Sequence, residues 1–474
     1  MIVLHEQFTT SRPAREVFAY ACEFAHCEQW DATAVSSRRI DAGPTRVGSR
    51  YRVVCRLPVG RLTLHYRVLK WQPDEQVVLE GSCAAFKVTD TITVRPEGAG
   101  TRLDYRAEFR FGAALRPLEP AMEAGLRRMG KASIAGLQEA LEDRLAPPRP
   151  SAATRWADRC ILPGVARFSK LGISRSRRHW RPVSSYLGGR HIVLTGASSG
   201  IGLAAARQLA AMGASLTLVV RDEARGRALV EQLRKDTGNE QVAIELADLS
   251  LMADVQRLVQ RLLAQGRPID VLINNAGALF NPRQVTAEGL EQSFALLLLA
   301  PYLLTEGLLP LLRRGTAPRV VNVVSGGMYT QQLVVRDLQS DRGRYSGSVA
   351  YARAKRALMV QTEEWAQAWQ ADGIVCNAMH PGWADTPGVA QALPAFRRIM
   401  RGVLRTPEEG ADTVVWLAAA REAGKVSGLL FLDREPHPTH LLARTRESAG
   451  ERVKLLEMLR SYAARFRAGQ DAGA

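Results

Sequence analysis

The sequence of 474 residues is poor in cysteine and aromatic residues, and it contains no long apolar run. A membrane-spanning helix needs about 20 apolar residues in a row, and the longest candidate, from Phe294 to Leu312, is interrupted by two prolines and a glutamate. The first residues lack the order of basic, apolar and small-residue regions that marks a secretory signal. These absences predict a cytoplasmic protein.

The six cysteines are scattered, without the Cys-x2-Cys spacing typical of zinc sites, and they suggest no disulfide framework. The closest pair of histidines, His437 and His440, has a proline between them, which argues against a helical metal site. The sequence therefore predicts reduced thiols and no metal.

The net charge of +17 would ordinarily suggest nucleic acid or an anionic membrane surface as a partner. Residues 151–190 carry nine basic residues and one acidic residue, so much of the excess lies in one short segment. No nucleic-acid-binding motif occurs and aromatic residues are few, so we expect no nucleic-acid partner.

Residues 1–145 show the alternation of a half-buried antiparallel sheet. Between Thr101 and Phe111, apolar and charged side chains occupy alternate positions. Further apolar runs, divided by Gly, Pro and Asp, indicate additional strands. A helical pattern of apolar residues then runs from Leu118 to Leu141, long enough for a helix that lies across the sheet.

This order of elements, with Phe8, Ala14, Val17 and Phe18 near the start, resembles the helix-grip fold of the polyketide-cyclase, START-like superfamily. The resemblance implies an α+β domain with an antiparallel sheet, a long C-terminal helix and a pocket for an apolar, lipid-like ligand. Candidate lining residues are Trp30, Tyr51, Phe86 and Tyr105. A filled core without a ligand is the alternative.

Residues 146–189 form a connector rich in proline and arginine, which opens with Pro-Pro-Arg-Pro at 147–150. Apolar and basic residues are mixed in it. Such a segment can pack on the neighbouring domain, which we favour, or make a peripheral contact with anionic lipid headgroups through residues 151–181.

A different pattern begins at residue 190. The apolar run to Thr195 predicts a strand, and Gly196, Gly200 and Gly202 follow directly before a helical run. Glycines in such a turn let backbone N–H groups approach a pyrophosphate at the positive end of the helix. Their spacing resembles the Thr-Gly-x3-Gly-x-Gly pattern of the short-chain dehydrogenase/reductase family.

Further motifs occur in the order of that family and extend the resemblance over residues 190–435. They are Asp248 with Leu249, the run Asn274, Asn275, Ala276 and Gly277, then Ser325, Tyr351 with Lys355, and Pro381 with Gly382 and Thr386. Strands and helices alternate throughout. The expected fold is α/β, a doubly wound parallel Rossmann sheet, with a C-terminal helix and tail over residues 436–474.

The resemblance implies a nicotinamide cofactor. Its expected contacts are Gly196, Ser198, Ser199, Gly200, Ile201, Gly202, Arg221, Asp248, Leu249, Asn275, Ala276, Gly277, Tyr351, Lys355, Pro381, Gly382 and Thr386. The second strand ends at Arg221, and an arginine there can pair with a 2′-phosphate, whereas an acidic residue favours the bare ribose. Although Asp222 is adjacent, Arg221 favours NADP(H) over NAD(H).

Tyr351 and Lys355 stand one helical turn apart on the same face. A nearby ammonium favours the phenolate and is expected to lower the pKa of Tyr351 from about 10, so that it can exchange a proton near neutral pH. The resemblance implies that Tyr351 is the acid/base, that Lys355 also binds the nicotinamide ribose, and that Ser325 hydrogen-bonds the substrate oxygen.

Two features depart from the compact members of the family. Leu297 stands where they carry an asparagine that helps to hold a water molecule in the proton relay, and a leucine cannot hydrogen-bond water. The segment between Ser325 and Tyr351 is longer and contains a charged run, 336–342. This insertion and residues 380–388 resemble retinol-dehydrogenase-like members, which implies a lipophilic alcohol or carbonyl substrate.

Three hypotheses follow. The first is an NADP(H)-dependent oxidoreductase whose N-terminal domain binds or presents a lipophilic substrate. The second, motivated by Leu297, is a catalytically impaired regulatory module that binds NADP(H) and lipid. The third makes the N-terminal domain a cyclase or lipid carrier unrelated to the dehydrogenase. A homo-oligomer, with the C-terminal helix packed on a partner subunit, stays open.

Overall fold

The computed structural model describes residues 1–31, 33–41, 45–56, 61–98, 100–112, 117, 119–141, 147–159, 166–177, 180, 183 and 187–471. The chain divides into two compact units, Met1–Ala146 with Arg181–Tyr186 and Pro147–Trp180 with Leu187–Ala474. Residues 147–180, expected to lie in a connector, thus group with the second unit.

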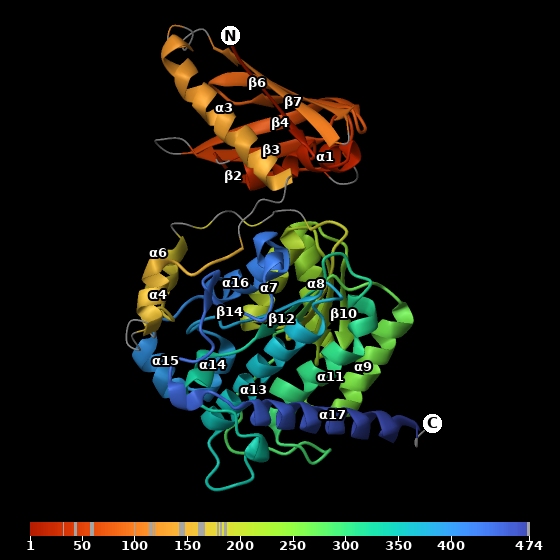
Figure 1. The fold of residues 1–474 in the computed structure, drawn as a ribbon, viewed down its shortest axis with the longest axis vertical. Coiled ribbons are helices and arrows are strands. Elements are labelled where there is room, and N and C mark those ends of the chain that lie inside the picture. Colours follow the sequence, from red (N-terminus) through yellow and green to blue (C-terminus); the bar gives the residue numbers. More distant parts are fainter. Residues whose placement is uncertain are drawn as a thin grey trace. The chain divides into compact units, whose positions relative to one another are not determined.

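Among its described residues, the first unit holds an antiparallel sheet of seven strands in the order β1-β7-β6-β5-β4-β3-β2 (Figure 1). The strands are β1 (Ile2–Thr10), β2 (Ala34–Arg39), β3 (Arg50–Arg56), β4 (Arg61–Gln72), β5 (Gln76–Ser82), β6 (Phe86–Glu97) and β7 (Gly100–Phe111). The helices are α1 (Ala14–Ala21), the 3-10 turn η1 (Phe24–His26), α2 (Cys27–Trp30) and α3 (Glu119–Leu141), of which α3 contacts β1 and α2. This is the predicted sheet with a long helix.

Alternation decides which face of the sheet is buried. In β7, Leu103, Ala107 and Phe109 are buried, while Arg102 and Arg106, at the alternate positions, are exposed. Helix α3 buries its C-terminal half against this face, through side chains such as Ile134 and Leu137. Leu118, where the helical pattern was expected to begin, lies outside the described residues.

The four candidate pocket residues of the first unit lie in several aromatic groups. The Trp30 and Tyr105 rings face each other with centroids 6.2 Å apart. Phe86 packs instead with Phe109, at 5.6 Å, and Tyr51 lies 6.3 Å from Phe24. Within the described residues, Trp30 and Tyr105 are therefore the only two of the four whose rings pair with each other.

A carboxyl group is buried among these rings. Asp90 on β6 is 2% exposed, and its Oδ1 accepts a hydrogen bond of 2.9 Å from the Tyr105 hydroxyl. Burial raises the pKa of Asp90 to about 7, although hydrogen bonds from Tyr66 and Tyr105 act against the shift. The folded first unit therefore favours the protonated acid below neutral pH.

The second unit is built on a sheet in the order β10-β9-β8-β11-β12-β13-β14-β15, parallel except for the last pair. Its described strands are β8 (His191–Thr195), β9 (Ser215–Val220), β10 (Val242–Leu246), β11 (Val271–Asn274), β12 (Arg319–Val323), β13 (Val375–Met379), β14 (Leu430–Leu432) and β15 (Glu435–His437). Strands β8, β9, β11 and β12 are buried throughout, as expected of parallel strands covered on both faces. The predicted doubly wound sheet is confirmed.

Helices cover both faces of this sheet (Figure 1). One layer consists of α7 (Gly200–Ala211), α8 (Glu223–Thr237) and α16 (Pro407–Ala419), and the other of α9 (Met252–Gln265), α11 (Ala300–Gly307) and α13 (Gly347–Ala368), with α17 (Ala449–Asp471) against α9 and α13. The shorter helices are α4 (Ala152–Arg159), α6 (Lys170–Ser176), α10 (Gln292–Phe294), α12 (Leu309–Leu312), α14 (Pro387–Ala392) and α15 (Pro394–Met400), and the 3-10 turns are η5 (Gly326–Thr330), η6 (Val335–Asp337), η7 (Glu422–Lys425) and η8 (Ala443–Thr445). A π-helical turn, η4 (Ala295–Leu299), precedes α11.

Local signals in the sequence set several of these boundaries. Helix α16 begins with a capping box, in which the Thr406 side chain accepts from the Glu409 N–H and the Glu409 side chain accepts from the Thr406 N–H. Helix α8 ends at Gly238, which takes the left-handed conformation. None of the described helices is long and apolar enough to cross a membrane.

We predict that Asp90→Asn changes the pH dependence of the stability of the first unit. The pKa of Asp90 is higher in the folded state than in the unfolded state. Its contribution to the free energy of unfolding is therefore complete below the pKa of the unfolded state and is lost as the pH rises towards about 7. The substituted asparagine side chain is neutral at every pH. The stability of the variant relative to the wild type should therefore be greater at pH 8 than at pH 5. Hydrogen exchange of β4–β7 in the two proteins measures this, and an equal difference at both pH values would contradict it.

Candidate active site

The turn between β8 and α7 depends on glycine at three positions. Gly196 and Gly200 have φ angles of +68° and +55°, in the left-handed region. A Cβ at Gly202 would meet the carbonyl oxygen of Gly196 at 2.1 Å. Ser198 and Ser199 are exposed in the turn, and Ser199 makes no side-chain cap. Backbone N–H groups at the start of α7 are thus open to an anion.

The Asn275 motif fastens this turn to the middle of the sheet. Asn275 Nδ2 donates to the carbonyl oxygens of Thr195 at 2.9 Å and Gly196 at 3.1 Å. The Thr195 hydroxyl accepts in return from the N–H groups of Asn275 and Ala276, each at 3.0 Å. The loops after β8 and β11 are therefore held side by side.

The loop after β13 returns to the same place. A Cβ at Gly200 would stand 3.2 Å from the Cβ of Thr386, and the Thr386 hydroxyl accepts from the Val389 N–H at 3.3 Å at the start of α14. Gly382 has a φ of +72°, and a Cβ there would meet the Phe168 carbonyl oxygen at 2.5 Å. The predicted contacts Gly200 and Thr386, far apart in sequence, therefore meet.

Residues predicted at the adenosine end of the site lie after β9 and β10. Asp222 Oδ1 accepts from the Arg225 N–H at 3.0 Å and caps α8, whereas Arg221 is exposed. Asp248 Oδ1 accepts from both the backbone N–H and the hydroxyl of Ser250, at 2.9 and 2.7 Å. Leu249 is buried and Ile201 is half-buried. The glycine turn at the start of α7 leaves space that a Cβ would fill, and such a turn fits the pyrophosphate of a dinucleotide.

The predicted catalytic residues come together from β12 and α13. Ser325 follows β12, and its side chain lies near enough to Tyr351 to favour a lower pKa of the phenol. Ser325 Oγ also accepts from the Gly327 N–H at 3.2 Å, which fixes the hydroxyl. One turn beyond Tyr351, the buried Lys355 donates from Nζ to the Val323 carbonyl oxygen at 2.7 Å. This is the arrangement expected for proton exchange with a substrate oxygen.

The pKa of Tyr351 moves in the direction opposite to the one expected. Burial raises it, and the hydrogen bond with Ser325 acts against the shift. Lys355 Nζ lies 6.0 Å from the centre of the Tyr351 ring, and burial lowers the pKa of Lys355 to about 7. Desolvation of both groups outweighs the attraction between the Lys355 ammonium and the Tyr351 phenolate, and the phenol is protonated at neutral pH.

Leu297 lies beside these groups, within the π-helical turn η4. It is fully buried, and a Cβ at Gly277 would stand 3.0 Å from Leu297 Cδ2 and 3.8 Å from Lys355 Nζ. An apolar side chain therefore lies near the ammonium where an amide was expected. The turn closes with the Ala300 N–H bound to the Ala295 carbonyl oxygen, five residues back.

The insertion between Ser325 and Tyr351 is held against the catalytic helix. Arg353, two residues after Tyr351, donates to Asp337 Oδ2 at 2.7 Å. Arg356 Nη2 donates to the Met328 carbonyl oxygen at 3.0 Å. The charged run is thus fastened to α13 at Asp337.

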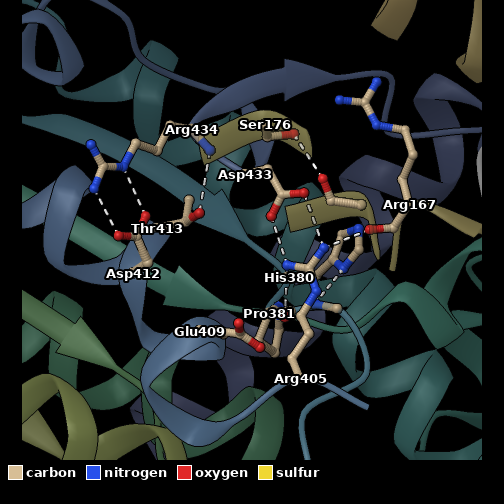
Figure 2. Close-up of polar contacts among 12 residues, drawn as sticks. Arg167, Ser176, His380, Pro381, Arg405, Glu409, Asp412, Thr413, Asp433 and Arg434 are labelled. Atoms are coloured by element: carbon tan, nitrogen blue, oxygen red, sulfur yellow. Dashed lines mark hydrogen bonds and ion pairs between the residues drawn. The ribbon is translucent and has the colours of Figure 1, made fainter. Parts of the chain in front are cut away.

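A buried arginine that the sequence argument missed joins the connector to this site (Figure 2). Arg405 forms a two-bond ion pair with Asp433, at 2.6 and 3.0 Å, with side chains 2% and 0% exposed. It also donates to the carbonyl oxygens of Arg167 at 2.5 Å, Ser169 at 3.2 Å and Pro381 at 3.3 Å. No motif marks either charged residue, because the pair forms across 28 positions and its further partners, Arg167 and Ser169, lie 238 and 236 positions away.

Phe168 is a second residue that sequence reasoning missed. Its ring lies 4.5 Å from His380 and 5.9 Å from Trp383, and a Cβ at Gly326 would stand 2.9 Å from it. Its carbonyl oxygen accepts from the Trp383 N–H at 2.8 Å. Because Gly326 directly follows Ser325, the segment before the Rossmann sheet forms a wall beside the catalytic serine.

Among the described residues, no group of three or more His, Cys, Asp or Glu side chains is placed to hold a metal ion. The fold and the assembled side chains define an NAD(P)-dependent oxidoreductase, in which the protein supplies an acid/base and binds the cofactor that carries the hydride.

Comparisons with known proteins agree with this class. Residues 190–395 match the short chain dehydrogenase family, and residues 1–142 match the family described as polyketide cyclase / dehydrase and lipid transport. The dehydrogenase/reductase SDR family member 12 of Bos taurus is 41% identical, over 64% of this chain and 96% of its own length. The chain belongs to the short-chain dehydrogenase/reductase family, and both resemblances are confirmed.

Other relatives carry more specific names. Retinol dehydrogenase 12 of Homo sapiens is 33% identical, over 58% of this chain and 84% of its own. Polyprenol dehydrogenase of Homo sapiens is 31% identical, over 62% and 92%. Among solved structures, the Pseudomonas aeruginosa RhlG/NADP active-site complex matches 52% of this chain and 95% of that chain, at 26% identity and a TM-score of 0.43.

We predict that Leu297→Asn raises the pKa of Lys355, because an amide oxygen can accept a hydrogen bond from the ammonium and favours the charged form. If activity requires the ammonium, the fall in kcat/KM for the cofactor that begins near pH 7 moves upward by about one pH unit. Leu297→Met keeps the site apolar and serves as the control. A pH profile that is the same in all three proteins would refute the role of Leu297.

Proposed function

We propose that this chain is an NADP(H)-dependent oxidoreductase that interconverts a lipophilic alcohol and its carbonyl compound. The observation that carries the proposal is the convergence of Ser325, Tyr351 and Lys355 beside a glycine turn that fits a dinucleotide. The names of the retinol and polyprenol dehydrogenases support a lipophilic substrate.

The chain's own residues account for the proton and for orientation. When bound, the nicotinamide supplies or accepts the hydride. In the reducing direction, Tyr351 is the phenol that donates its proton to the carbonyl oxygen. Ser325 holds the substrate oxygen near the phenol, and water restores the Tyr351 proton afterwards.

Arg221 supports NADP(H) over NAD(H). Its neighbour Asp222 accepts from the Arg225 N–H and caps α8, so the carboxylate that would favour a ribose diol is engaged in the helix. Arg221 is exposed at the end of β9, where a guanidinium can form two hydrogen bonds with a 2′-phosphate.

The wall of Phe168, Tyr329 and Trp383 supports a lipophilic substrate. These rings come from the connector, from η5 after Ser325 and from the loop after β13, with Phe168 and Tyr329 stacked at 6.3 Å. Trp383 extends the wall towards Phe396 on α15, at 5.8 Å. Aromatic side chains at the edge of the site offer apolar contact rather than hydrogen bonds to a substrate.

A catalytically impaired module that binds NADP(H) and lipid is the second candidate, and Leu297 is the observation that favours it. Its apolar side chain leaves the neighbourhood of Lys355 without the amide that compact members use. Turnover decides between the two, since a binding module holds NADPH without oxidising it.

We predict that Tyr351→Phe lowers kcat by about 100- to 10,000-fold, because it removes the acid/base and leaves the ring in place. The assay follows NADPH oxidation with long-chain and isoprenoid aldehydes. NADPH binding, followed by its fluorescence, should persist in the variant and shows that the fold is intact. Turnover equal to that of the wild type would refute the assigned role.

For the cofactor, Arg221→Ala should raise the KM for NADPH by about 10- to 100-fold, the effect of losing a charge-assisted hydrogen bond. The KM for NADH should change little, since NADH has no 2′-phosphate. Arg225→Ala, at an exposed neighbouring position, is the matched control. A wild type that prefers NADH, or equal effects of Arg221→Ala on both cofactors, would overturn the assignment.

A further inference from the structure

Highly exposed apolar side chains occur on three helices of the second unit. Among the described residues, Ile399 on α15 is 81% exposed, Leu171 on α6 is 74% exposed and Trp156 on α4 is 62% exposed. Apart from the N-terminal Met1, no other large apolar side chain among these residues is as exposed as they are. Isolated exposed apolar residues need no explanation, but three on neighbouring helices do.

Two hydrogen bonds link the segments that carry these helices. The Lys170 N–H at the start of α6 donates to the Val403 carbonyl oxygen, just beyond α15, at 2.8 Å. The Arg167 side chain donates to the Thr154 hydroxyl of α4 at 2.5 Å. Figure 1 shows α4, α6 and α15 on the same side of the second unit. We call this surface, with Trp156, Leu171 and Ile399, the basic face.

The charge of the basic face is almost entirely positive. Its three helices and the residue after α15 carry Arg155, Arg159, Lys170, Arg175, Arg398 and Arg401, all exposed. Asp158, the acidic residue within these helices, is paired with His437 at 2.9 Å. Arg397 is likewise paired, with Asp385. The remaining cations greatly outnumber the available carboxylates.

A hollow in this face is suited to an anionic group. It has a volume of about 280 Å³ and is lined by Ala390, Pro394, Arg397, Arg398 and Arg401. Arg398 and Arg401 at this hollow, beside the Arg397–Asp385 pair, match the charge and donor pattern of a phosphate. Exposed apolar residues beside such a hollow match the interface of a bilayer, where acyl chains lie beneath anionic headgroups.

We propose that the basic face docks on an anionic lipid bilayer, with Trp156, Leu171 and Ile399 entering the headgroup region and Arg398 and Arg401 binding lipid phosphate. The surface adjoins the substrate end of the site. Leu171 lies three residues after Phe168, and Phe396 of α15 packs on Trp383. Docking would allow a lipophilic substrate to pass from the bilayer to the wall beside Ser325. This inference rests on the proposed function.

The test is flotation of the full-length protein with phosphatidylcholine vesicles, with and without phosphatidylglycerol. The wild type should float only with the anionic vesicles. Arg398→Gln with Arg401→Gln should lower partitioning on the order of 20-fold, from the loss of two cations near the surface. Leu171→Ser with Ile399→Ser should lower it by about tenfold or more. The matched control, Val453→Ser with Arg460→Gln on α17, should behave like the wild type.

Several outcomes would overturn docking. They are failure of the wild type to float, equal flotation of all variants, loss in the arginine variant alone, and binding of a DNA duplex in place of vesicles. NADPH turnover of a water-soluble aldehyde is measured in parallel and does not depend on docking. If the protein floats but does not oxidise NADPH, the proposed function is contradicted. If it oxidises NADPH but does not float, only docking is contradicted.

Discussion

The buried ion pair between Arg405 and Asp433 holds the catalytic edge of the second unit together. A guanidinium has five N–H donors, and Arg405 makes five hydrogen bonds. Two reach Asp433, and three reach carbonyl oxygens in the connector and in the loop at Pro381. Loss of either charge would leave the other buried and unpaired, which costs about 3–5 kcal/mol. The connector is therefore an integral part of the site.

The lysine of the site has a different electrostatic environment. Lys355 is buried, and it donates a hydrogen bond to the neutral carbonyl group of Val323 rather than to a carboxylate. Burial alone accounts for the lowering of its pKa, and Leu297 contributes to the apolar surroundings. The same burial raises the pKa of Tyr351. Solvent exclusion thus sets the protonation of both groups, and the chemistry of the site follows from its packing.

The sequence predicted those parts of the protein that depend on local pattern or fixed spacing. Alternation over β7, the glycines at 196–202 and the turn between Tyr351 and Lys355 each follow from one segment of chain. Phe168, Arg405 and Asp433 could not be predicted, because their contacts join segments more than two hundred residues apart in sequence or depend on burial. The direction of the Tyr351 pKa shift was wrong for the same reason, since desolvation depends on the whole packed neighbourhood.

The two outer strands of the second sheet have a further consequence. At one edge, β15 has three residues, includes Pro436, and has Glu435 bound by Thr154 and Arg167. At the other edge, Arg261 donates to the Leu246 carbonyl oxygen of β10 at 2.7 Å. Short, proline-containing or covered edges discourage strand addition. Association of two copies of this chain is therefore directed away from a continuous intermolecular sheet and towards contacts between helices.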